Sequence, residues 1–415
     1  MPSPDAQQEL LPVSFNAYVN RNTTRAGATG ELSLATLGAS AGFGVFAYYT
    51  NGQLYSQMSL PDFMYNQQVT SNDGGNTWTY SPVKYWPNET GSTAMSEETD
   101  YLTFFAYAPY ADVNPNTGKV TSDESFGIFG MTRAKDTGDP YVKYRASYDP
   151  TKAVDLCWSK TNNIDKTKQA VNSTVNFNFQ HALAALNVQI DADIDVVSHA
   201  SSTLDENTRI YVRSITFRGF AEKGQLNLNL GNWNNLDCDC DLTSQPITIY
   251  DGRRDGREGV AASLNETRTG LNPDIIQSGA YTTDPSFAST TDGVTNTQVN
   301  LFDVSGMTSA TDEQKRLAPI YVIPTNDPLE VTIVYDVETY DPKLVSQYLS
   351  DGRTHGSTIE NNITATIKNS SSEEITLAAR NKYTINIHLG MTSVKVNASV
   401  TEWKEGDSAD VEVPK

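Results

Sequence analysis

Residues 175–190 read Val-Asn-Phe-Asn-Phe-Gln-His-Ala-Leu-Ala-Ala-Leu-Asn-Val-Gln-Ile, and this stretch decides between a helical and a β fold. Apolar and polar residues alternate from Val175 to Phe179, and Val188 and Ile190 leave the stretch with the same period of two. Successive side chains of a strand point to opposite faces of the sheet, so apolar residues that recur at every second position share one face. The central His-Ala-Leu-Ala-Ala-Leu has helical propensity, but the alternation on both sides predicts strand throughout.

The same alternation recurs along the chain in segments that are bounded by Gly, Asn, Asp or Pro. These segments are residues 11–19, 45–49, 101–108, 141–148, 210–217, 225–230, 320–323, 329–337, 383–389 and 394–400. Short strands with turn residues between them predict an all-β protein built of sandwich domains. The long polar stretches 113–139 and 251–300 are predicted to be surface excursions, and residues 342–349 offer one or two helical turns.

Composition narrows the class of protein. A chain of 415 residues is long enough for two or three domains, and 38% hydrophobic residues are too many for a disordered chain. The net charge of −20 repels phosphate backbones, so nucleic acid is not an expected partner.

Three cysteines cannot form a disulfide framework. No apolar run is long enough to span a membrane, and the first ten residues resemble no signal peptide, so we expect any export signal to be absent from this chain.

Motifs for catalysis are weak. Residues 38–42 match Gly-x-Ser-x-Gly, but an aromatic strand follows where a nucleophile elbow needs a helix, so a small-residue turn is the better interpretation. The four histidines, His181, His199, His355 and His388, are scattered, and each is interpreted as a surface or cross-strand residue. We therefore predict no catalytic residue, no cofactor and no obligatory metal.

Alternating acids and thiols occur once, at Asp237, Cys238, Asp239, Cys240 and Asp241. In an extended strand the acids would share one face. An EF-hand loop would need glycine and glutamate where this chain has Leu242 and Thr248, so that pattern fails. A solvated turn is the favoured interpretation, and whether Asp237, Asp239 and Asp241 bind a metal stays open.

Five blocks of the sequence carry a family resemblance. Residues 78–87 read Trp-Thr-Tyr-Ser-Pro-Val-Lys-Tyr-Trp-Pro, and residues 101–109 read Tyr-Leu-Thr-Phe-Phe-Ala-Tyr-Ala-Pro. Together with residues 175–188 and with the C-terminal blocks 383–387 and 394–403, they resemble the fimbrillin family, which comprises type V pilus subunits and related surface lipoproteins of Gram-negative anaerobes.

The resemblance implies two transthyretin-like β-sandwich domains in tandem, with residues 26–170 as the first and 171–415 as the second. The polar, Lys- and Asn-rich composition of residues 160–172 predicts the boundary there. Residues 1–25 would be a removable strand with its processing site. It also implies an exported lipoprotein of the outer membrane or fimbrium, although no cysteine precedes Cys157 and the lipidation site cannot be identified.

Assembly in this family implies that a protease removes the first strand and that a neighbouring subunit donates a replacement. The removable strand would present Leu11, Val13, Phe15, Ala17 and Val19, with trypsin-like processing at Arg21 or Arg25. The alternative interpretation is that these two arginines only solvate a loop. The donor segment would present Val394, Val396, Ala398, Val400, Trp403, Val411 and Val413. Expected partners are other copies or related pilus subunits, the processing protease, and a host or bacterial surface ligand.

Two functions compete at this point. One is a polymerising pilus subunit that serves adhesion, and the other is a non-polymerising surface lipoprotein of the same fold that binds a glycan or a protein. A stalk, anchor or tip position, the adhesion ligand and the protease are not specified by the sequence.

The processing hypothesis makes a prediction for limited proteolysis. Trypsin should cut first after Arg21 or Arg25, with the Gly-flanked arginines of residues 253–257 as the competing site, because polar segments outside strand ladders are cut fastest. Mass spectrometry of the early fragments gives the order of cleavage. Persistence of the bonds after Arg21 and Arg25 through prolonged digestion would contradict the hypothesis.

Overall fold

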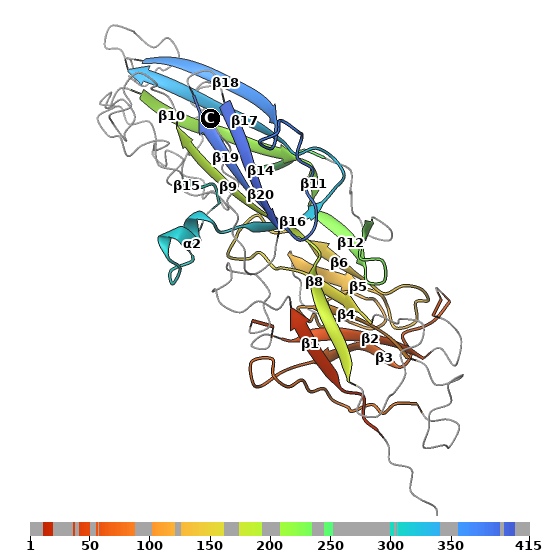
Figure 1. Ribbon diagram of the computed structural model, residues 1–415. Coiled ribbons are helices and arrows are strands. Elements are labelled where there is room, and N and C mark those ends of the chain that lie inside the picture. Colours follow the sequence, from red (N-terminus) through yellow and green to blue (C-terminus); the bar gives the residue numbers. More distant parts are fainter. Residues whose placement is uncertain are drawn as a thin grey trace, which may run out of the picture.

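The computed structural model describes residues 11–19, 36–37, 41–49, 55–56, 58–87, 102–120, 126–161, 174–192, 208–234, 245–251, 299–302, 304, 306–340, 356–390 and 394–402. Strands dominate these residues, as the sequence predicts. Figure 1 shows an elongated molecule with two sheets at each end: one end, called the first half, holds most of the N-terminal strands together with residues 223–234, and the other end, called the second half, holds the remaining strands. The segment 342–349 lies outside the described residues.

The first sheet has the order β1-β8-β7-β4-β2-β3 among the described strands. These strands are β1 (Phe15–Val19), β8 (Val175–His181), β7 (Cys157–Lys160), β4 (Leu102–Ala108), β2 (Phe43–Tyr49) and β3 (Met64–Val69). Nearly every residue of β2 and all of β4 are buried. Strands that are apolar on both faces belong to the middle of a layered structure, so this sheet must be covered on both sides.

A second sheet covers one face of the first. Its order is β13-β12-β6-β5, formed by β13 (Trp233–Asn234), β12 (Lys223–Asn227), β6 (Tyr141–Arg145) and β5 (Gly127–Met131). Phe46, Phe105 and Tyr144 meet in the core between the two sheets. Strand β5 lies within residues 113–139, so the prediction of a surface excursion there is wrong. The Gly-rich, polar flanks hid a short buried strand.

The other face of the first sheet is covered by residues 70–87. Thr70 and Thr79 pair in an antiparallel bridge, and Asp73 closes the turn between them by accepting hydrogen bonds from Thr77. These hydrogen bonds lower the pKa of the exposed Asp73 carboxyl to about 2. The turn delivers Trp78 onto Phe43, with ring centroids 5.0 Å apart.

The second half contains two further sheets. One has the order β14-β10-β17-β18, formed by β14 (Ile247–Asp251), β10 (Thr208–Arg218), β17 (Glu330–Tyr340) and β18 (Gly356–Thr366). The other has the order β11-β16-β9-β19-β20 with β15 beside β9, formed by β11 (Phe220–Ala221), β16 (Ile320–Pro324), β9 (Ala184–Ala192), β19 (Asn381–Leu389), β20 (Val394–Glu402) and β15 (Val299–Asn300). A short helix, α2 (Asp312–Arg316), precedes β16.

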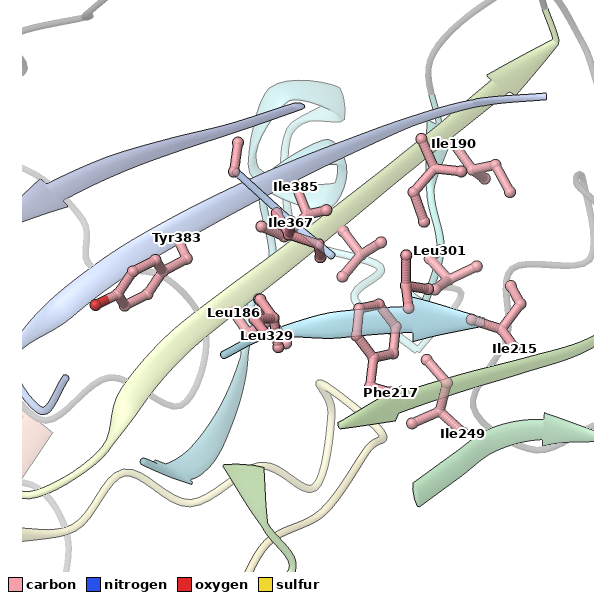
Figure 2. Packing of buried hydrophobic residues seen from close by; sticks show 14 of the residues in the cluster. Leu186, Ile190, Ile215, Phe217, Ile249, Leu301, Leu329, Ile367, Tyr383 and Ile385 are labelled. Carbon is pink, nitrogen blue, oxygen red and sulfur yellow. The ribbon is translucent and has the colours of Figure 1, made fainter. Parts of the chain in front are cut away.

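An apolar core fills the space between these two sheets. Figure 2 shows Phe217 and Ile215 of β10 facing the same cluster as Leu186 and Ile190 of β9, with Ile385 of β19 beside them. These residues alternate with polar neighbours along their strands, which is the pattern of a sandwich with one face of each sheet buried.

The change from the first pair of sheets to the second occurs at residues 182–183, between β8 and β9. Strand β8 pairs with β7, so strand pairing crosses the predicted boundary at residues 160–172. Strand β12 also pairs back to β6. The division of the chain into two domains at residue 170 therefore does not coincide with the pairing, because the alternation of residues 175–190 runs from one sheet into the other.

Packing of β8 predicts the effect of a core mutation. Phe177 is fully buried and its ring lies 5.8 Å from the rings of both Phe15 and Phe43. Phe177→Ala should lower the free energy of unfolding of the first half by about 3–5 kcal/mol, because it removes buried apolar area and leaves a cavity. Chemical denaturation measures this. Met58→Ala, at a side chain that is 81% exposed, is the control and should change stability little.

Candidate functional site

The predicted removable segment lies along the edge of the first sheet. Its alternate side chains Val13, Phe15, Ala17 and Val19 are buried, whereas Leu11 is 40% exposed. Regular strand structure begins at Phe15. The alternation read from the sequence therefore corresponds to one buried face over residues 13–19.

Backbone hydrogen bonds hold this segment on two sides. Strand β1 pairs in parallel with β8, with Phe15 opposite Val175 and Val19 opposite Phe179. Before β1, the amide of Val13 donates to the carbonyl of Lys84, and the amide of Trp86 donates to the carbonyl of Leu11, both at 2.9 Å. The segment is thus inserted between β8 and residues 84–86.

Aromatic side chains form the floor beneath the segment. The ring centroid of Phe15 lies 5.3 Å from Tyr80, 5.9 Å from Phe104 and 5.8 Å from Phe177. The Tyr80 hydroxyl donates a 2.8 Å hydrogen bond to the carbonyl of Val13. Burial raises the pKa of Tyr80, which keeps the hydroxyl protonated as a donor. Tyr80 and Trp86 belong to the first block of the resemblance, so that block supplies part of this floor.

Position at the sheet edge makes β1 separable. It is the terminal strand of its sheet among the described strands, so its withdrawal breaks the ladder with β8 and the two hydrogen bonds to residues 84–86, and leaves β8 as the new edge. An unpaired edge with an apolar floor is a site for strand addition. The predicted processing residues Arg21 and Arg25 follow β1 closely in the sequence and lie outside the described residues.

The first part of the predicted donor segment forms β20, which is the edge strand of a different sheet among the described strands. It pairs antiparallel with β19 from Val394 opposite Leu389 to Glu402 opposite Asn381. Ala398 is buried, and Val394 and Val396 are half-buried against the core of the second half.

The structure describes only one of the remaining donor residues. Val400 is 37% exposed on β20. Trp403, Val411 and Val413 lie outside the described residues, as do Asp237, Asp239 and Asp241. Residues 394–402 are therefore already a strand of their own subunit's sheet, which the sequence did not indicate.

Three polar side chains that the sequence did not connect lie together where β7 meets β8. Asp155 precedes β7, Cys157 opens β7, and His181 ends β8 directly opposite Cys157. His181 Nδ1 lies 2.8 Å from Asp155 Oδ2 and 3.3 Å from Cys157 Sγ, and Sγ lies 3.8 Å from Oδ2. All three side chains are buried. Their meeting depends on the order of the strands in the sheet, and no local pattern of the sequence reveals that order.

This cluster does not have the arrangement of a nucleophilic triad. Both Asp155 and Cys157 contact the same imidazole nitrogen, whereas a triad places the orienting acid and the nucleophile on opposite nitrogens. The Cys157 side chain is also fully buried, and a nucleophilic thiol must reach its substrate.

One family profile and one known protein each match most of this chain. The profile of the family described as fimbrillin-like matches residues 24–403. The chain belongs to the fimbrillin-like family. The fimbrium subunit Fim1C of Phocaeicola vulgatus is 23% identical over 397 residues, which cover 93% of this chain and 88% of that protein.

A solved structure also resembles this fimbrillin-like chain. The crystal structure of a fimbrial protein from Bacteroides vulgatus aligns with a TM-score of 0.53 at 18% identity, covering 94% of this chain and 99% of that one. At this identity the likeness concerns the fold alone. Among the described residues, no helix has the length and apolar character needed to cross a membrane.

Contacts of the N-terminal segment predict how tightly it is held after cleavage. Phe15→Ala should speed dissociation of the trimmed N-terminal fragment by about a hundredfold or more, because loss of a buried Phe costs about 3–5 kcal/mol and each 1.4 kcal/mol is a factor of ten. Gel filtration with mass spectrometry of released fragment follows the rate. Asn16→Ala, on the opposite face of β1, is the matched control, and equal rates for the two variants would contradict the prediction.

Proposed function

We propose that this protein is a structural subunit of a cell-surface pilus, assembled by donor-strand exchange after proteolytic removal of its first strand, and serving adhesion. Membership in the fimbrillin-like family and similarity to a protein named as a fimbrium subunit support the pilus assignment. The observation that carries the mechanism is the edge strand β1, which fills an aromatic groove with Phe15 and whose adjacent segment contains two arginines.

Cleavage at Arg21 or Arg25 frees the segment from the chain that follows it. Withdrawal then exposes the positions that Val13, Phe15 and Val19 cover, and each large apolar side chain that refills the groove contributes roughly 1.5–3 kcal/mol. The intact chain thus protects its own groove, and the trimmed chain presents an edge that only another strand satisfies.

The donor comes from the C-terminal region of a neighbouring subunit. Its residues Val394, Val396, Ala398 and Val400, followed by Trp403, Val411 and Val413, alternate with polar residues over most of their length, as a strand with one buried face requires. Head-to-tail donation does not close on itself, so it builds a filament. Partners are other copies or related subunits, with a trypsin-like protease as the trigger.

Location follows from this function. A pilus subunit acts outside the cell, so the protein is exported to the outer membrane as a lipoprotein and is then incorporated into the fimbrium. The subunit has a structural and adhesive role without catalysis, and its buried Cys157 is consistent with that.

One observation favours the alternative function, a non-polymerising surface protein that binds a glycan or protein ligand. Strand β20 already completes its own sheet, and Ala398 faces its own core, so donating β20 to a neighbour would cost this subunit a paired edge strand. The two functions differ in whether the C-terminal region joins subunits.

Polymer formation by trimmed protein separates the two functions. The full chain is trimmed with trypsin and examined for SDS-resistant ladders by gel electrophoresis. Deletion of residues 394–415 should abolish the ladders, because it removes every proposed donor residue. Deletion of residues 403–415 alone tests whether the donor begins within β20 or after it.

A point variant avoids the loss of a whole strand. Val400→Asp places a charge on a residue that is 37% exposed in the subunit but would be buried in a neighbour's groove, so it should reduce polymer while leaving the melting temperature nearly unchanged. Thr401→Asp, at the next position on the opposite face, is the control. Undiminished ladders after deletion of residues 394–415 would favour the surface-binding alternative.

A further inference from the structure

Three donor atoms of different chemistry converge where β7 meets β8. They are Asp155 Oδ2, Cys157 Sγ and His181 Nδ1, with separations of 2.8 to 3.8 Å. Cys157 and His181 are register partners on β7 and β8, Asp155 precedes β7, and all three side chains are buried. They are the group of metal-ligating side chains that the described part of the chain brings together.

Protons alone satisfy this geometry poorly. The nitrogen His181 Nδ1 faces both a carboxylate oxygen and a sulfur, yet an imidazole nitrogen carries at most one proton. If Nδ1 donates its proton to Asp155, it cannot accept the thiol proton of Cys157, and the thiol then donates across a long 3.8 Å contact to the same carboxylate oxygen. If it accepts that proton, its lone pair also faces the lone pairs of the carboxylate. A cation at the point where the three atoms converge would bond to all of them at once.

We propose that Asp155, Cys157 and His181 bind a zinc ion. Thiolate, imidazole and carboxylate are the ligands of protein zinc sites, and bond lengths of about 2.0–2.3 Å at tetrahedral angles put donor atoms about 3.2–3.6 Å apart. Of the observed separations, 3.3 Å lies within that range, whereas 2.8 and 3.8 Å lie just outside it, so binding requires the donor atoms to shift by a few tenths of an ångström. Binding releases the thiol proton of Cys157 to solvent, and the fourth position takes a water or a backbone carbonyl.

The ion would join two strands at a narrow junction. In the register of β7 with β8, Cys157 is opposite His181 and Trp158 is opposite Gln180. Strand β8 is also the strand on which β1 pairs. If the proposed pilus function is right, zinc would keep β8 fixed to the sheet while β1 is absent, and so preserve the groove for the incoming strand.

Metal content of the untrimmed chain tests the site independently of polymer formation. Cys238→Ser and Cys240→Ser leave Cys157 as the single thiol of the chain. This variant is unfolded with a chelator, refolded with Zn²⁺ or Co²⁺, and dialysed, because a buried site is loaded during folding. We expect about one ion per chain by mass spectrometry of the metal, and a thiolate-to-Co²⁺ charge-transfer band with the strong visible bands of a tetrahedral site.

Variants assign the ligands. Cys157→Ser should abolish the charge-transfer band, and His181→Gln should release most of the ion. His388→Gln is the matched control, because His388 pairs with Asp191 between β19 and β9, and it should leave the metal content unchanged. If a ligand variant does not fold, the spectrum of the parent decides, since its one thiol is Cys157. Refolded parent without bound metal, or a Co²⁺ form without the thiolate band, would overturn the proposal.

Discussion

The pairing of β8 is the interaction on which the rest of the structure depends. On one side β8 holds β1 in a parallel ladder, and on the other it meets β7 where Cys157 lies opposite His181. Its own chain continues into β9, which lies in the core of the second half. A single alternating segment therefore supports the edge strand, completes the first sheet and connects the two halves of the molecule (Figure 1).

Period-two alternation predicted most of this architecture. It identified the strands of residues 175–190 despite their helical propensity, because Phe177 and Phe179 need one buried face whatever their neighbours prefer. It missed β5, whose burial depends on a partner strand, and α2, although Thr311 and Gln314 form a capping box that the sequence displays. It could not reveal which sheet each strand joins, since pairing between distant segments leaves no local pattern.

The candidate site likewise has one part that the sequence predicted and another part that it could not predict. The buried face of β1 could be predicted because Val13, Phe15, Ala17 and Val19 alternate within one segment. The pairing of β20 with β19 and the meeting of His181 with Asp155 could not, because they depend on strand order. These long-range contacts bear most on function: one decides what donation of β20 costs the subunit, and the other brings three metal-ligating groups beside the groove.

The central claim is that β1 is a replaceable strand, and a reversible lock tests it most directly. Asn16 and Asn176 are register partners on β1 and β8, and their side-chain amides are hydrogen-bonded. Cysteines at both positions, in a chain with Cys238→Ser and Cys240→Ser, would form a disulfide that retains β1 after trimming. The account predicts monomer for the oxidised, trimmed protein and SDS-resistant ladders once it is reduced. Equal ladders in both states would contradict it.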